Sequence, residues 1–183
     1  MTRLVAFLRA VNVGGHVVRM EDLRVLFEEL AFTDVATFIA SGNVVFQCRA
    51  ADERAIETRI ERHLRKALGW EAATFVRTPA SLAAIARYEP FPHAPANADK
   101  SRSYVAFTRE PPTAAFRRSV EALATAQDEL HVLDREIYWL SRVSMRESTV
   151  SGAALEKAVG GPVTLRNVNT VRRMVERFGL TDA

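Results

Sequence analysis

Two short groups of polar and glycine residues near the start of the chain have the composition of an anion site. The first group follows an apolar run, and the second lies in a turn signal between two β-rich runs. Together they comprise Arg9, Asn12, Gly14, Gly15, Ser41, Gly42 and Asn43. Arginine offers a planar fork of donors to carboxylates and phosphates, and glycine lets backbone N–H groups approach an anion closely. We therefore predict a site for an anionic small molecule here, for example a phosphate-bearing one.

The same residues also have a purely structural interpretation. Glycine supplies positive φ in turns, and asparagine side chains hydrogen bond to nearby backbone groups. The chain contains neither G-x-x-x-x-G-K-[ST] nor G-x-G-x-x-G, the two complete phosphate motifs. An enzyme using this pocket is a further alternative, with His16 or Ser41 in a chemical role. The catalytic residues, the cofactor and the reaction are unknown from the sequence.

A second and weaker polar cluster lies in the C-terminal half, ahead of one expected helix and at the end of one expected strand. It comprises Arg142, Ser144, Arg146, Arg166, Asn167 and Thr170. One interpretation is another anion site. The alternative is helix capping by Ser148 and Asn167 with solvated arginines, since serine and asparagine are frequent caps.

Other reactive side chains give weaker signals. The four histidines, His16, His63, His93 and His131, show no metal-ligand spacing, so no metal site is predicted. Cys48 lies at the end of an expected strand, where a small core residue is a better interpretation than a nucleophile. A lone cysteine forms no internal disulfide and fits a reducing compartment.

The charge balance and the hydropathy of the chain limit the classes of protein to which it can belong. The chain has 183 residues, with 25 Lys and Arg against 22 Asp and Glu. This excess is small and forms no block of like charges, as expected for charges spread over helix surfaces. No apolar run approaches the roughly 20 residues that span a membrane, and no signal peptide precedes the first strand. We expect a cytoplasmic protein that does not enter the membrane.

Hydrophobic periodicity predicts the elements that must position these residues. In the first half we expect strands at 3–9, 35–40, 44–48 and 73–77, and helices at 20–30, 52–69 and from Pro79 to Glu89. In the second half we expect strands at 104–108, 130–133, 137–140 and 163–165, and helices at 113–127, 148–159 and 167–179. The element order therefore repeats, although the letters do not.

This repeated order predicts an α+β fold in which a ferredoxin-like β-α-β-β-α-β unit, followed by an extra helix, is duplicated. The expected organisation is a first half at residues 1–88, a proline-rich linker at 89–102 and a second half at 103–183. Domains of about 80 residues are marginal alone, so we expect the halves to pack as one compact unit. In each half the first and second strands run the same way, so the first loop and the hairpin turn share one edge of the sheet.

The opening motif resembles that of a bacterial family, the domain of unknown function 1697. The matching residues are Arg9–Gly15, Met20, Leu23, Gly42, Asn43 and Phe46, and later Thr164–Asn167 and Thr170. Ala10 and Val11 stand where glycine and isoleucine are usual, and His16 stands where lysine is common. The resemblance implies a duplicated ferredoxin-like fold and no established activity.

Ferredoxin-like sheets can also bind RNA through exposed aromatic residues. The expected central strands carry only Phe7 and Phe46 among aliphatic residues, and no RNP signature is present. Nucleic-acid binding is therefore not favoured, although a nucleic-acid or protein interaction module stays an alternative. The oligomeric state is unknown from the sequence.

Overall fold

The computed structural model describes residues 1–49, 52–92 and 102–181. The chain divides into two compact units: the first unit is Met1–Leu82 with Leu180–Ala183, and the second unit is Ala83–Gly179. Residues 93–101 of the predicted linker lie outside the described residues. The expectation that the two halves pack as one compact unit stays a prediction.

The first unit contains a four-stranded antiparallel sheet with the strand order β2-β3-β1-β4. Its elements are β1 (Thr2–Leu8), α1 (Met20–Glu28), β2 (Thr33–Thr37), β3 (Asn43–Cys48), α2 (Glu53–Leu68) and β4 (Thr74–Arg77). Helix α3 (Pro79–Arg87) follows, and the boundary between the units falls within it. This is the β-α-β-β-α-β order that the hydrophobic periodicity predicts.

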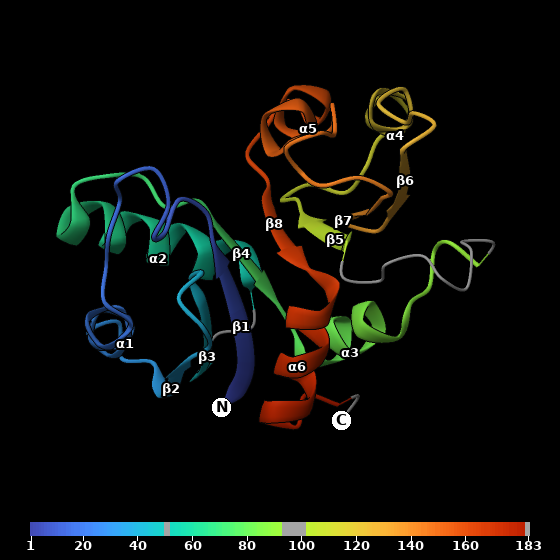
Figure 1. Ribbon diagram of the computed structural model, residues 1–183. Coiled ribbons are helices and arrows are strands. Elements are labelled where there is room, and N and C mark those ends of the chain that lie inside the picture. The colour runs from blue at the N-terminus through green and yellow to red at the C-terminus, as the bar shows by residue number, and fades with distance from the viewer. Residues whose placement is uncertain (50–51, 93–101, 182–183) are drawn as a thin grey trace. The chain divides into compact units, whose positions relative to one another are not determined.

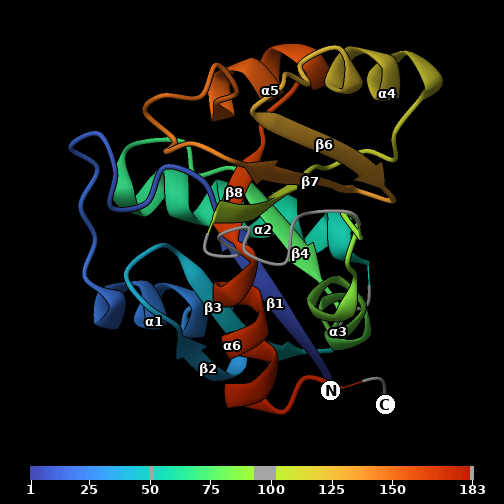
Figure 2. The ribbon, with the colours of Figure 1, turned by 45° about the vertical axis from the view of Figure 1, so that its right-hand side comes forward.

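The second unit repeats this architecture, with the strand order β6-β7-β5-β8. Its elements are β5 (Ser103–Phe107), α4 (Ala114–Glu121), β6 (Asp128–Leu133), β7 (Glu136–Ser141), α5 (Gly152–Val159), β8 (Thr164–Asn167) and α6 (Val168–Phe178). Figure 2 shows α4 and α5 together over one face of this sheet. The predicted fold class, a duplicated ferredoxin-like α+β protein, is therefore confirmed.

Apolar residues on α1 and α2 cover one face of the first sheet (Figure 1). Leu23 and Phe27 of α1 pack in the same cluster as Ala6 of β1 and Phe46 of β3. Cys48 also belongs to this cluster, as expected for a small core residue. The opposite face is buried too, because Val5, Phe7, Val45 and Phe75 expose 3% of their surface or less. Both faces of the first sheet are therefore apolar.

Side-chain caps and left-handed glycines fix the helix ends. The Asp52 carboxylate accepts hydrogen bonds from the N–H groups of Arg54 and Ala55, and Gly69 ends α2 with φ +84°. Asn167 caps α6, where its side chain accepts from the N–H group of Asn169. Aspartate and asparagine are frequent helix caps, and glycine is frequent where a helix ends in a left-handed residue.

The expected Ser148 cap is wrong. Ser151 caps α5 by accepting a hydrogen bond from the N–H group of Ala154. The Ser148 hydroxyl instead donates to Oδ1 of Asp128 at 2.8 Å. Asp128 is almost fully buried and also accepts from Trp139 Nε1 at 2.8 Å. Because the Asp128 carboxylate binds the Ser148 hydroxyl, Ser148 does not cap the helix, and α5 starts one turn later than expected.

The largest remaining differences from the predicted bounds are in α4 and β2. Helix α4 ends at Glu121 instead of Gln127 because Thr125 closes a turn into β6, its N–H donating to the Asp128 carbonyl at 3.0 Å. Strand β2 covers Thr33–Thr37 instead of residues 35–40. The left-handed backbone of Ile39, with φ +50°, ends the extended conformation before the hairpin turn.

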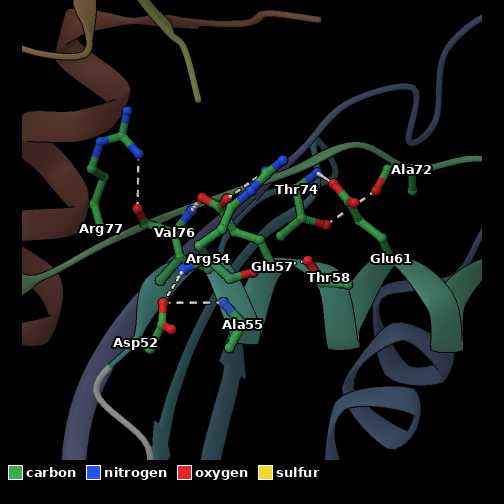
Figure 3. A network of polar contacts seen from close by, with 10 residues as sticks. All are labelled: Asp52, Arg54, Ala55, Glu57, Thr58, Glu61, Ala72, Thr74, Val76 and Arg77. Carbon is green, nitrogen blue, oxygen red and sulfur yellow. Dashed lines mark hydrogen bonds and ion pairs between the residues drawn. The ribbon is translucent and has the colours of Figure 1, made fainter. Parts of the chain in front are cut away.

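Strand β4 is an edge strand, and α2 supplies acceptors for its backbone (Figure 3). Glu57 Oε1 accepts from the Val76 N–H at 2.8 Å, and Glu61 Oε1 accepts from the Thr74 N–H at 2.8 Å. The spacing of four on a helix, about 6 Å, matches the spacing of two on a strand, about 6.6 Å. The two glutamates thereby satisfy edge N–H groups that could otherwise pair with another chain.

Candidate binding site at one edge of the first unit

Three connections meet at the edge of the first sheet where β1 ends. They are the β1–α1 connection (residues 9–19), the β2–β3 turn (residues 38–42) and the α2–β4 connection (residues 69–73), and we call this edge the rim. The Leu8 N–H donates to the Gly42 carbonyl at 2.8 Å, and the Arg9 N–H donates to the Ala73 carbonyl at 2.8 Å. The structure thus brings the predicted Arg9–Gly15 and Ser41–Asn43 segments together at one edge.

Asn12 joins the β1–α1 connection to the β2–β3 turn. Its Nδ2 donates to the Ala40 carbonyl at 2.9 Å, and its Oδ1 accepts from the Val18 N–H at 2.9 Å. The backbone of Asn12 is left-handed, with φ +56°, a conformation that asparagine tolerates better than most residues. Asn12 therefore positions the connection with both ends of its amide.

Asn43 holds the β2–β3 turn closed. Its side chain is fully buried, and its Nδ2 donates to the Phe38 carbonyl and to Ser41 Oγ, each at 2.9 Å. The Ser41 hydroxyl therefore receives a hydrogen bond from Asn43. Both asparagines of the predicted site act on the protein's own backbone, which makes them positioning residues for the rim.

Gly14 and Gly15 form the tip of a small hairpin within the β1–α1 connection. Val13 and His16 pair as an isolated antiparallel bridge, and the His16 N–H donates to the Val13 carbonyl at 3.1 Å. Both glycines have positive φ, +58° and +87°, as a two-residue type I′ turn requires. A Cβ atom at either glycine would meet nothing within 4 Å, so the tip is open to an approaching ligand.

Further left-handed residues gather at the rim. Ala10 has φ +60°, Ile39 has φ +50° and Gly42 has φ +72°. A Cβ atom on Gly42 would lie 3.0 Å from the Cβ atoms of both Leu8 and Val11, so only glycine fits this crossing. Positive φ is strained for a β-branched residue such as Ile39, and such strain is concentrated at functional sites.

His16 contacts Trp70 across the rim. Their ring centroids lie 4.7 Å apart with an interplanar angle of 46°. Trp70 follows Gly69, which ends α2, so the contact joins the β1–α1 connection to the α2–β4 connection. Within the described residues, Nε1 of Trp70 is buried and has no hydrogen-bond partner. Sequence reasoning missed Trp70, because only the long-range contact with His16 distinguishes it from a residue that simply follows a helix.

The start of α1 already carries acidic side chains. Glu21 and Asp22 lie in its first turn, and Nε of Arg19 lies 2.8 Å from Oδ2 of Asp22. The hydrogen bond from Arg19 lowers the pKa of Asp22. These carboxylates complement the positive end of the helix dipole. An external anion is therefore better placed at the glycine turn than at the N-terminus of α1.

The residues of the second polar cluster have separate local partners. Arg142 forms an ion pair with Glu129. The N–H group and the hydroxyl of Ser144 donate to Oε2 of Glu147 at 3.0 and 2.6 Å. Arg146 is exposed, and Thr170 is half-buried in the first turn of α6. Asn167 is the α6 cap.

Arg166 is buried in the second unit. Its Nη1 donates to Thr164 Oγ1 and to the Leu165 carbonyl, each at 2.8 Å. Burial lowers the pKa of Arg166 to about 10, so the side chain stays charged at neutral pH. Arg166 therefore has a structural role, because it donates hydrogen bonds to Thr164 and Leu165 of the same strand, β8.

The described part of the chain offers neither a metal site nor a membrane-spanning helix. It contains no group of three or more His, Cys, Asp or Glu side chains that could hold a metal ion. None of its helices combines the length and apolar character needed to cross a bilayer.

The fold and the rim together define a duplicated ferredoxin-like protein with a glycine-tipped connection beside its first sheet. The chain belongs to the family described as protein of unknown function (DUF1697), whose family model matches residues 1–138. The fold is similar to that of the conserved bacterial protein SP0830 from Streptococcus pneumoniae, with a TM-score of 0.72 and 20% identity over 96% of this chain and 99% of that one. A search of curated proteins found no match.

Proposed function

We propose that this protein binds a small anionic ligand at the rim, with Gly14, Gly15, His16 and Trp70 in contact with it. The observation that carries the proposal is the buried Nε1–H of Trp70, which has no hydrogen-bond partner among the described residues. An indole N–H can only donate. A buried donor without an acceptor costs about 1–3 kcal/mol, and an oxygen of a bound anion would offset this cost.

The surroundings of Trp70 suit an anion. The His16 ring lies against the indole, and the open Gly14–Gly15 turn directly precedes His16 in the same small hairpin. Glycine backbones can approach a phosphate or carboxylate closely. Arg9 lies at the exit of β1 on the same edge and would add positive charge. Asn12 and Asn43 would hold this arrangement in place without contacting the ligand.

The proposal is tested by calorimetry and tryptophan fluorescence with inorganic phosphate, glucose 6-phosphate and AMP. The chain has two tryptophans, and Trp139 is fully buried with its Nε1 bonded to Asp128. We expect at least one of these anions to give saturable heat and to change the emission of Trp70. Absence of heat and of any emission change for all three would contradict the proposal.

The Trp70→Phe variant keeps an aromatic ring against His16 but removes the N–H donor. Loss of a hydrogen bond to a charged group should weaken binding about tenfold or more, and the fluorescence response should disappear. Arg142→Ala, in the second unit, is the matched control and should bind as the wild type does. Equal affinity of the Trp70→Phe variant and the wild type for the anion would show that the indole N–H does not bind it.

We also propose a cytoplasmic, bacterial setting for this protein. The lone cysteine, Cys48, is buried and forms no disulfide among the described residues, which is usual in a reducing compartment. A bacterial protein shares the fold. Cell fractionation with an antibody against the protein tests the location.

A further inference from the structure

The register of the two sheets shows which residues are equivalent in the two units. Val5 of β1 pairs with Arg77 of β4, and Val105 of β5 pairs with Arg166 of β8. The second helix of each unit ends at a left-handed glycine, Gly69 with φ +84° for α2 and Gly160 with φ +72° for α5. The residue after that glycine is Trp70 in the first unit and Gly161 in the second. The position that holds a tryptophan in the first unit therefore holds a glycine in the second unit.

This difference leaves a space in the second unit. In the first unit, Trp70 reaches His16 and so joins the α2–β4 connection to the β1–α1 connection. In the second unit, a cavity of about 300 Å³ lies between the corresponding α5–β8 and β5–α4 connections. Gly161 lines it, and a Cβ atom at Gly161 would meet nothing within 4 Å. The cavity lies where the first unit inserts its own indole.

The lining of the cavity indicates the kind of ligand. Arg109 and Glu110 provide one positive and one negative side chain. The apolar part of the wall is formed by Pro111, Phe116, Val159 and Pro162. Its two hydroxyl groups are engaged: Thr108 Oγ1 donates to the Arg135 carbonyl at 2.9 Å, and Thr113 Oγ1 accepts from the Phe116 N–H at 3.1 Å. The lining thus combines one basic residue, one acidic residue and an apolar wall.

We infer that this cavity binds a free amino acid with an apolar side chain. The carboxylate of such a ligand would face Arg109, since a guanidinium binds carboxylates through paired hydrogen bonds. Its ammonium group would face Glu110, and its side chain would lie against Phe116 and the prolines. A ligand with a large net charge would be repelled by whichever of Arg109 and Glu110 carries a charge of the same sign. The volume is at the lower end of the range for small-molecule sites, which suits a ligand of this size.

The direct test is chemical-shift mapping of the ¹⁵N-labelled protein during titration with L-leucine and L-phenylalanine. We expect saturable shifts for at least one of the two, centred on residues 108–116 and 159–162. Isovalerate, which lacks the ammonium group, and leucinamide, which lacks the carboxylate, should each bind at least about tenfold more weakly than leucine because each loses one ionic contact. Failure of both amino acids to shift these resonances, or binding of isovalerate or leucinamide as tight as that of leucine, would overturn the inference.

A pair of variants at one position provides an independent test. Gly161→Trp places an indole where the first unit has Trp70 and should abolish amino-acid binding. Gly161→Ala adds only a methyl group to open space and should bind within about twofold of the wild type. The φ of Gly161 is not positive, so both side chains are compatible with its backbone. Unchanged affinity in a folded Gly161→Trp protein would overturn the inference, and Arg109→Met serves as the second variant if that protein does not fold.

Discussion

The side-chain amide of Asn12 donates to the Ala40 carbonyl across 2.9 Å and so joins two connections that lie 28 residues apart in the chain. The same amide accepts the Val18 N–H through its oxygen. One side chain therefore fixes the glycine-tipped hairpin against the β2–β3 turn. The geometry proposed for anion binding depends on this link, because the hairpin itself contains only one isolated bridge.

We predict that Asn12→Ala destabilises the protein by about 1–3 kcal/mol, since it removes two hydrogen bonds and places alanine at positive φ. Urea unfolding measures the change. Asn12→Gly is the matched control, because glycine loses the same hydrogen bonds but adopts positive φ without strain. The glycine variant should lose less stability than the alanine variant. If both variants unfolded at the same urea concentration as the wild type, Asn12 would not be needed to hold the rim.

Gly42 and Gly14 should respond differently to alanine. Both have positive φ, +72° and +58°, so both substitutions carry a backbone cost of about 1 kcal/mol. Only at Gly42 would the new Cβ atom lie 3.0 Å from the Cβ atoms of Leu8 and Val11, which adds about 1–3 kcal/mol of overpacking. Thermal unfolding of the two variants gives the comparison. Equal losses at the two positions would contradict the close crossing at Gly42.

Glu57 should be needed to cover the edge of the first sheet (Figure 3). Glu57→Ala leaves the Val76 N–H without its carboxylate acceptor, which should cost about 1–3 kcal/mol. Glu57→Gln keeps an oxygen for Val76 and should cost less. Hydrogen exchange of the Val76 amide should be faster in the alanine variant than in the glutamine variant. Similar stability and exchange in the two variants would show that the acceptor is not important.

Asp128 should make stability depend on pH in the acid range. Burial alone would raise the pKa of Asp128, but hydrogen bonds from Trp139, Ser141, Ser148 and Thr125 outweigh burial and lower it. The carboxylate therefore stabilises the fold fully above its unfolded pKa, about 3.9, and this stability is lost as the pH falls through the lower folded pKa. Unfolding measured from about pH 6 to about pH 2 should show this loss.

In the Asp128→Asn variant this part of the pH dependence should be absent, and stability at neutral pH should fall by about 2–3 kcal/mol because an amide replaces one acceptor oxygen with a donor. Ser151→Ala is the control, since it removes an exposed cap in the same unit without affecting Asp128. An unchanged slope in Asp128→Asn would assign the acid sensitivity to other groups.

Sequence patterns predicted the fold because the signals involved are local. Continuous apolar runs of strand length mark the strands, and the Asp52 cap and the Gly69 end are typical of their residue types next to a helix. The wrong prediction of a Ser148 cap shows what local sequence patterns do not determine. Ser148 and Ser151 are equally good caps by type, and the choice between them depends on Asp128, which lies 20 residues before Ser148 at the start of β6.

The candidate site was predicted only in part, for a related reason. The topology places Asn12 and Ser41 at one edge, so their proximity follows from the strand directions. The direction of each side chain does not follow, and both predicted asparagines turned out to bond with the backbone. Trp70 was missed because its contact with His16 is long-range, and Gly161 was missed because its position becomes informative only when the two units are compared through their strand registers.

The central claim, anion binding at the rim, is tested most directly by titrating the ¹⁵N-labelled protein with inorganic phosphate. We predict saturable shifts of the Gly14, Gly15 and His16 amides and of the Trp70 indole N–H, with the resonances of the second unit unchanged. The absence of saturable shifts at these four groups, or shifts confined to the second unit, would contradict the account.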